Sequence, residues 1–170
     1  MACTQCLGFL DLPTIYNISY PVGPNMPNLR DDVLLVQTLM KLANFSSKSK
    51  DHDVIEMSSN VKIDGWFGEQ TKLMIEAFEL CVRDEHLFLA ADGIIEPSSS
   101  NGYTPQGIIY KIIHLNRFAK QATAFGSKYN EIPTDPETHP ILRLSLLAQN
   151  KIPATKGGMA PEYLVNYPQP

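Results

Sequence analysis

An Asp-Gly turn followed by two aromatic residues is the part of this 170-residue sequence best suited to contact a ligand. The turn is Asp64-Gly65, and Trp66, the only tryptophan of the chain, follows it directly. A tight turn should present Trp66 outward, where its ring can pack against a sugar or a peptide while nearby polar groups form hydrogen bonds. The candidate ligand-binding residues are Trp66 and Asp64, together with three residues on predicted loops: Arg30, Asn60 and Tyr103.

The residue types that carry catalysis do not form a recognisable pattern. A glycosidase needs two carboxylates about 5 to 10 Å apart around a cleft, whereas Glu76 and Glu79 are predicted to lie on the solvated face of a helix. A zinc enzyme needs two or three histidines with a carboxylate. The four histidines are widely scattered: His52, His86, His114 and His139. We therefore predict a protein that is not an enzyme and has no cofactor.

The cysteines do not predict a metal site either. Cys3 and Cys6 form a C-x-x-C pair, which is half of a zinc site, and the sequence has no second pair to complete it. Cys81 falls on the apolar face of a predicted helix, where a small buried thiol is the ordinary interpretation.

Charge and hydropathy exclude several function classes. The formal net charge is -4 and the basic residues are scattered, so nucleic acid is not an expected partner. The sequence has no run of about eighteen apolar residues, so we expect no membrane insertion. The first residues lack a basic region and Asp11 interrupts their apolar patch, which predicts that they are not a Sec signal peptide.

Two helices are predicted to form the first part of the core. The first should follow Asn28 as its N-cap, with Asp31 and Asp32 in its first turn. Its core face is a set of apolar residues at helical spacing: Val33, Val36, Leu39, Met40 and Ala43. The second should begin near Glu69, with Thr71 as a cap. Its apolar stripe consists of Leu73, Met74, Ala77, Phe78 and Cys81.

A third helix is predicted from the best helix-start signal in the chain. Thr104 is a natural N-cap, and Pro105 would occupy the first helical position, where its missing N–H costs nothing. The expected buried face contains Ile108, Ile109, Ile112, Ile113 and Ala119, whereas Lys111 and Lys120 are expected outside it.

The two ends of the chain are predicted to lie outside this helical core. Residues 1–14 are interpreted as a flexible arm, and residues 14–20 as a short β-strand. Residues 140–149 are compatible with either a strand or a helix, and we favour a strand that pairs with 14–20.

A short repeat links two parts of the sequence. Ile63-Asp64-Gly65 precedes the second predicted helix, and Ala91-Asp92-Gly93 precedes the third. Glycine takes the positive φ of a tight turn, and the aspartate oxygen accepts bonds from nearby backbone N–H groups. Both aspartates are therefore interpreted first as turn-formers, and the Gln37 amide is predicted to bond the backbone of one such turn.

Three motifs in this order resemble the peptidoglycan-binding domain family, the helical wall-binding module of phage lysins, wall hydrolases and type VI secretion effectors. The first motif is carried by Val22, Gly23, Asn28, Asp32, Val33, Val36, Gln37 and Leu39. The middle motif is carried by Asp64, Gly65, Phe67, Gly68 and Thr71. The closing motif is carried by Asp92, Gly93, Ile95, Pro97, Thr104, Leu115 and Asn116.

The resemblance implies a mainly α fold and a binding function. It predicts a three-helix peptidoglycan-binding core at residues 22–131, after an N-terminal arm and possible strand at 1–21 and before a C-terminal extension at 132–170 that adds a short strand. The expected function is non-catalytic recognition of bacterial peptidoglycan, which targets the chain or a partner to the cell wall. Without a Sec signal, the chain would be made in the cytoplasm and act in the periplasm or at the cell wall after non-Sec export.

The sequence leaves an alternative of another class open. The chain could keep this fold without wall binding and act as a protein–protein adaptor or a secretion-system accessory protein. A partner protein would then be contacted through the C-terminal arm, whose proline-rich end can lie along another surface. Three features favour this alternative: the absence of a predicted signal peptide, the long loops 46–60 and 98–103, and a C-terminal arm of nearly forty residues. Glu69, in place of a proline, is a further departure from the family pattern.

Overall fold

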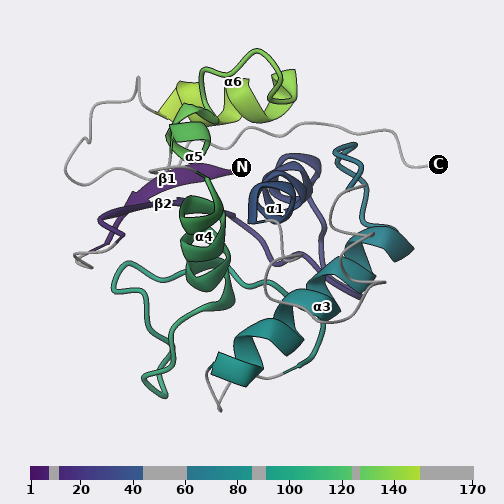
Figure 1. Ribbon diagram of the computed structural model, residues 1–170, viewed down its shortest axis with the longest axis vertical. Helices are drawn as coiled ribbons and strands as arrows, with labels where there is room; N and C mark the ends of the chain where they lie inside the picture. The colour runs from purple at the N-terminus through teal and green to yellow at the C-terminus, as the bar shows by residue number, and fades with distance from the viewer. Residues whose placement is uncertain (8–11, 44–60, 86–90, 124–126, 150–170) are drawn as a thin grey trace.

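The computed structural model describes residues 1–7, 12–43, 61–85, 91–123 and 127–149, and within them the fold is mainly helical. A small antiparallel hairpin precedes five helices (Figure 1). In chain order the elements are β1 (Cys3–Cys6), β2 (Thr14–Asn17), α1 (Arg30–Ala43), α3 (Glu69–Glu85), α4 (Lys111–Ala122), α5 (Ser127–Glu131) and α6 (Pro140–Gln149). In the part of the chain that is described, no helix is both long enough and apolar enough to span a membrane.

The helix α1 lies in the middle of the molecule, with the hairpin and α4 to its left, α3 below it and α6 above it in the view of Figure 1. All its residues from Asp32 to Met40 are buried, so its neighbours cover it on every side. A helix that is apolar on most of its circumference needs such a central position to remove that surface from water.

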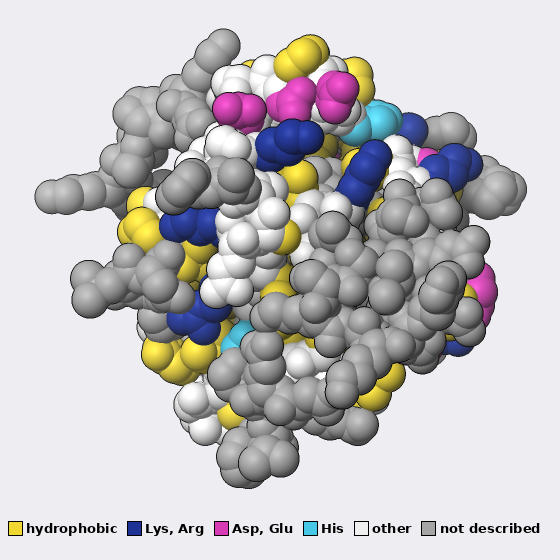
Figure 2. Space-filling view, viewed as in Figure 1, with side chains coloured by type: hydrophobic (Ala, Val, Ile, Leu, Met, Phe, Trp, Pro, Cys, Tyr) yellow, Lys and Arg dark blue, Asp and Glu magenta, His cyan; other side chains and the backbone are white. Residues whose placement is uncertain are grey.

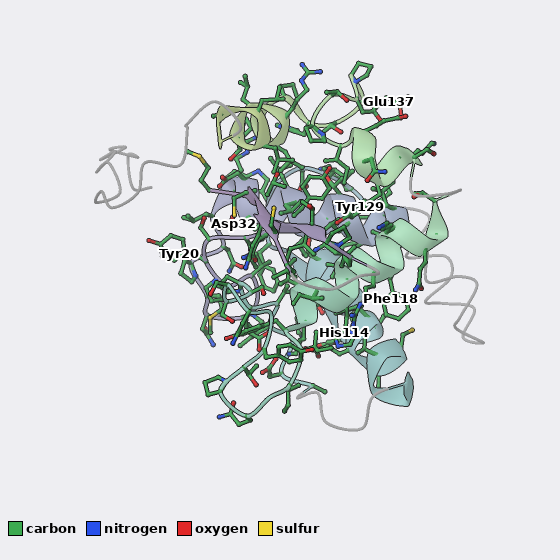
Figure 3. All side chains as sticks on the ribbon, turned by 90° about the vertical axis from the view of Figure 1, so that its left-hand side faces the viewer. Tyr20, Asp32, His114, Phe118, Tyr129 and Glu137 are labelled. Atoms are coloured by element: carbon green, nitrogen blue, oxygen red, sulfur yellow. The ribbon has the colours of Figure 1, made fainter. Side chains whose placement is uncertain are left out.

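Asp31 and Asp32 lie in the first turn of α1, as predicted, but both are also attached to other elements. The Asp32 carboxylate is fully buried and accepts hydrogen bonds from the backbone N–H groups of Ser19 (3.1 Å) and Tyr20 (3.0 Å). Figure 3 shows Tyr20 next to Asp32 at the outer edge of the molecule. Burial raises the pKa of Asp32 to about 6, although these hydrogen bonds act in the opposite direction.

The prediction that Asn28 caps α1 is wrong. Asn28 has a φ of 47°, and its side chain is bonded within its own loop, to the N–H and C=O of Gly23 at 2.9 Å each. Asparagine adopts this left-handed conformation more readily than most residues, because its side chain can bond the local backbone. Its amide therefore closes the loop before the helix, and α1 begins two residues later at Arg30.

The helix α3 begins at Glu69, as predicted. Met74 and Phe78 from the predicted stripe are fully buried, and the ring of Phe78 packs edge-on against Phe118 of α4 with centroids 6.0 Å apart. The same interior extends around the helix to Ile75 and Val82. This packing attaches α3 to α4 across the core.

The helix α4 begins at Lys111, so the predicted start at Thr104 and Pro105 is wrong. The Thr104 side chain accepts a bond from the N–H of Ile108 (3.2 Å), and its own N–H bonds the Ile108 carbonyl (2.7 Å). Gly107, at φ 79°, closes this loop. The Thr-Pro signal therefore starts a closed turn, because the left-handed glycine ends it after one loop.

The prediction of a flexible arm at residues 1–14 is wrong for its described part. Cys3–Cys6 forms β1 and pairs antiparallel with β2, with Cys3 opposite Asn17 and Cys6 opposite Thr14. The predicted strand at 14–20 is confirmed over Thr14–Asn17, where Ile15 is fully buried. The N-terminal segment thus completes the hairpin instead of leaving β2 unpaired.

The preference for a strand at residues 140–149 is wrong, and the helical alternative is confirmed as α6. Leu142 and Leu146, four residues apart, are fully buried, and Ser145 between them donates a hydrogen bond to Asp31 at 2.9 Å. Helical spacing buries these three side chains on one face against the hairpin and α1.

One hydrophobic cluster takes in residues from all three predicted segments of the chain, from Ala2 to Leu146. A buried polar group joins three of its elements. The Asn116 side chain bonds the backbone of Tyr16 and accepts the hydroxyl of Tyr129 at 2.5 Å. Tyr129 is labelled between the helices in Figure 3. The domain boundaries at 22 and 131 remain a prediction.

Candidate functional site

The first Asp-Gly turn presents Trp66 on a backbone held by internal hydrogen bonds. Gly65 has a φ of 76°, and the Asp64 carboxylate accepts the N–H of Trp66 at 2.9 Å. This is the turn predicted from the sequence. The Trp66 side chain is 69 % exposed, which confirms that the turn directs it outward. A large apolar ring held at that exposure on an ordered turn is a ready contact for a ligand.

Gln37 of α1 holds this turn from the inside, as predicted for its amide. Its oxygen accepts the N–H groups of Asp64 (3.1 Å) and Gly65 (2.9 Å). Its nitrogen donates to the Asp64 carboxylate and to the Trp66 carbonyl, both at 3.1 Å. One neutral side chain therefore satisfies both the donors and the acceptors of the turn.

Thr71 belongs to the same network and does not cap α3 at its start. Its hydroxyl lies within α3, accepts from the Gln37 amide at 3.1 Å and donates to the Trp66 carbonyl at 3.3 Å. The prediction of a cap is therefore wrong in detail, because the hydroxyl bonds the turn that precedes the helix.

The second Asp-Gly turn repeats this geometry with different chemistry. Gly93 has a φ of 72°, and the Asp92 carboxylate accepts the N–H of Ile94 at 3.0 Å. The N–H of Gly93 is bonded by both oxygens of Glu79, at 3.0 and 3.1 Å. Lys111 donates to the Ile94 carbonyl (2.8 Å), to Glu79 (2.7 Å) and to Asp92.

The burial of this ion pair corrects two predictions. Lys111 was expected outside the apolar face and Glu79 on a solvated face, but their side chains are only 2 % and 3 % exposed. Both are buried because α4 begins at Lys111, which places its ammonium over α3 and the second turn. The sequence offers no glutamine equivalent to Gln37 for the second turn. With the structure known, that lack indicates that other side chains must bond this turn.

The two turns also affect the pKa of their aspartates. Burial acts to raise the pKa of Asp64, but bonds from Trp66, Gln37 and Lys62 outweigh it and lower the pKa. For Asp92, burial is again outweighed, in this case by Lys111 and the N–H of Ile94, and the pKa is lowered. Both carboxylates are therefore ionised and fully engaged in holding their turns.

Lys111 and Glu96 complete the electrostatics of the second turn. Burial acts to lower the pKa of Lys111, but its bonds to Asp92 and Glu79 outweigh it and raise the pKa. Burial raises the pKa of Glu96, whose carboxylate lies 3.9 Å from the Lys111 ammonium. One ammonium is thus surrounded by three carboxylates.

The structure brings three of the five predicted ligand-binding residues together. Asp64 and Trp66 share the first turn, and Arg30 lies against it at the start of α1 instead of on a loop. A Cβ placed on Gly65 would come within 2.7 Å of the Arg30 Cγ. The glycine is therefore required here both by its positive φ and by the close approach of Arg30.

The other two predicted residues are not part of this group. Asn60 lies outside the described residues. Tyr103 is 39 % exposed on the loop before α4, where it forms an isolated β-bridge with Ile109. In Figure 1 this loop lies at the lower left, whereas the start of α3, next to the first turn, lies at the right.

No metal site is found among the described residues: none of their histidine, cysteine, aspartate and glutamate side chains form a group of three or more that could hold an ion. Cys3, Cys6 and Cys81 are free thiols, and burial raises the pKa of Cys3. Cys81 is half-buried and packs against the core, as expected for a small apolar side chain.

Comparison with models of known protein families gave no match, and neither did comparison with curated proteins or with solved structures. The resemblance to the peptidoglycan-binding domain therefore remains a prediction that is based on the three motifs.

Proposed function

We propose that this protein binds bacterial peptidoglycan without catalysis and directs itself or a partner to the cell wall. The observation that carries the proposal is the exposed Trp66 on a turn whose motif resembles the wall-binding family and whose backbone is held by Gln37. The proposal places this binding in the periplasm or at the cell wall.

The physical basis is preorganisation. Binding costs conformational entropy whenever a contact residue must be ordered, and a turn already held by hydrogen bonds avoids most of that cost. Tryptophan adds a large rigid contact area with only two side-chain torsions to fix. A repeating wall polymer with many equivalent sites suits a module of this kind, because even modest affinity per site retains the protein.

The test is a pull-down with purified insoluble peptidoglycan. We expect the intact chain to sediment with the polymer and Trp66→Ala to lose most of this retention. Leu144→Ala is the matched control, because Leu144 is also apolar and 67 % exposed but lies on α6. Absence of retention for the intact chain, or equal loss in both variants, would contradict the proposal.

A second candidate function has a specific observation in its favour. The helix α6 has a buried face, yet Ile141 and Leu144 on its other side are 37 % and 67 % exposed. Figure 2 shows charged side chains gathered at the end of the molecule where α5 and α6 lie. An apolar strip beside charged groups is typical of a protein-binding surface, which supports an adaptor that contacts a partner protein through its C-terminal region.

Substitutions of Trp66 and Leu144 separate the two proposals. An adaptor function predicts that Leu144→Asp abolishes capture of a partner from the producing cell, and that Trp66→Ala does not. Wall binding predicts the reverse order of effects on sedimentation with peptidoglycan.

A further inference from the structure

The charged groups around Trp66 are paired with one exception. Lys62 lies 3.4 Å from the Asp64 carboxylate, and Lys72 lies 3.6 Å from Glu69 at the start of α3. The Arg30 side chain, in contrast, makes no ion pair or hydrogen bond with any residue that the structure describes. Among the described residues of the turn region, Arg30 thus carries the one positive charge without a paired acid.

The position of Arg30 is unfavourable for the helix that carries it. It is the first residue of α1, where the helix dipole disfavours a positive charge. The stem of the side chain lies against Gly65, because a Cβ built on this glycine would come within 2.7 Å of the Arg30 Cγ. Arg30 is therefore held beside the turn that presents Trp66, without a role in pairing any described acid.

We infer that Arg30 and Trp66 together bind a peptide that carries a free carboxylate. A guanidinium forms two parallel hydrogen bonds with a carboxylate, and an indole ring beside it packs against the aliphatic part of the same peptide. Leu29, which is 37 % exposed and precedes Arg30, extends the apolar surface. This inference rests on the proposed wall binding, and it specifies that the acidic peptide stem is recognised and that the glycan is not.

The acids near this surface do not compete for Arg30. Asp64 is engaged by Lys62, by the Gln37 amide and by the N–H of Trp66. Asp31, the residue after Arg30, bonds the N–H of Ala2 at 2.9 Å and the hydroxyl of Ser145. Among the described residues, these nearby acids therefore leave Arg30 open to a carboxylate from another molecule.

The single tryptophan provides a direct measurement, because all indole fluorescence of the chain comes from Trp66. The probe is a synthetic stem peptide, alanyl-γ-D-glutamyl-lysyl-D-alanyl-D-alanine, prepared as the free acid and with every carboxylate amidated. We expect the free acid to shift the emission of Trp66 and to bind about fivefold or more tightly than the amide, as for a partly exposed charged hydrogen bond.

Two variants test the role of Arg30. Arg30→Gln should bind both peptides with equal affinity, and Arg30→Lys should keep only part of the preference, because it keeps the charge without the planar fork. Lys41→Gln, which removes an exposed positive charge near the other end of α1, should keep the full preference. Unchanged thermal unfolding of Arg30→Gln shows that its fold is intact.

Failure of the inference can be distinguished from failure of the proposed function. Equal affinity for acid and amide in the intact chain, an unchanged preference in Arg30→Gln, or no binding of either peptide would each overturn the inference. If insoluble peptidoglycan still retains the intact chain in those cases, wall binding stands. The ligand is then the glycan if neither peptide binds, and an unchanged preference in Arg30→Gln means that another group recognises the stem. If the polymer does not retain it, both proposals fail.

Discussion

The two Asp-Gly turns have the same backbone geometry but are held by different chemistry. In the first turn the oxygen of Gln37 accepts the N–H of the glycine, and its nitrogen donates to the aspartate and to the next carbonyl. In the second turn these roles are divided between the Glu79 carboxylate and the Lys111 ammonium. The buried ion pair thus makes the hydrogen bonds to the second turn that the Gln37 amide makes to the first.

The difference shows that two turns of the same geometry can be held by neutral hydrogen bonds in one case and by buried charges in the other. The first turn is held by the neutral amide of Gln37 from α1 and by the Thr71 hydroxyl from α3. The buried ion pair connects α3, α4 and the second turn, and loss of one partner leaves a charge without compensation in the interior. We therefore expect the second turn to be the more sensitive to single substitutions, and the first turn to be the better platform for a binding residue.

The largest effect is expected for Lys111→Met. It leaves the Glu79 carboxylate buried without its cation, and we expect the free energy of unfolding to fall by about 3–5 kcal/mol in urea titrations. The double variant Glu79→Gln/Lys111→Met should recover part of this loss. Lys128→Met, at an exposed lysine of α5, serves as the control. A loss below about 1 kcal/mol would mean that the pair is not buried in solution.

The next effect compares the two glycines. Gly65→Ala places a Cβ 2.7 Å from the Arg30 Cγ and 3.1 Å from its carbonyl, in addition to the cost of positive φ. Gly93→Ala has the same φ cost, but its nearest neighbour is Pro24 at 3.6 Å. We expect losses of about 2–3 kcal/mol for Gly65→Ala and about 1 kcal/mol for Gly93→Ala in chemical unfolding. Equal losses would show that Arg30 moves aside without cost.

Gln37→Leu should have a smaller effect than Lys111→Met. It removes the shared partner of the first turn but leaves no buried charge, so we expect a loss of about 2 kcal/mol. Trp66 emission should shift at the same time, because its carbonyl loses a bond from Gln37. A loss that equals that of Lys111→Met would contradict the distinction between the neutral and charged turns.

The smallest effect concerns pH. Burial raises the pKa of Asp32 to about 6 and raises that of Glu96, so the folded chain binds these protons more readily than the unfolded chain. Stability should therefore rise as pH falls from 7 to 5, by about 1 kcal/mol for Asp32. Asp64 and Asp92, whose pKa values are lowered, contribute stability that is lost only as pH falls below about 4.

Thermal unfolding across this pH range tests the assignment. Asp32→Asn should remove most of the rise in stability toward pH 5. Glu96→Gln should remove the smaller contribution of the acid beside the second turn. Gln37→Leu should leave the slope between pH 7 and 5 unchanged, since the first turn has no acid with a raised pKa among its contacts. A constant or falling stability toward pH 5 in the intact chain would contradict the direction of both shifts.

Much of the helical core could be predicted from local patterns. The apolar spacing of α1 and α3 indicates which faces are buried, and the Asp-Gly pairs indicate turns whose φ values are positive in the structure. The role of Gln37 could also be predicted, because its position beside the apolar stripe leaves an amide that needs a partner. The helix faces and the turns depend on residues close together in sequence, whereas Gln37 bonds a turn that lies further along the chain.

The errors have both local and distant causes. The Thr104-Pro105 signal is locally valid for a helix, but Gly107 ends it as a turn and α4 begins at Lys111. The apolar residues of 140–149 fit both the helical and the strand spacing, and burial of Leu142 and Leu146 against the rest of the core selects the helix. Asn28 bonds its own loop because Gly23 lies within reach of its amide.

The sequence by itself determined the mainly helical composition, the two turns and the outward position of Trp66, because these follow from residue spacing and from the conformations open to glycine and aspartate. Only the tertiary structure decided that Arg30 lies against the first turn and that Lys111 and Glu79 form a buried pair. Their positions result from the packing of α1, α3 and α4 around one core. Charge pairs between elements far apart in sequence leave no periodic signal, since their energy depends on distance and burial in the folded chain.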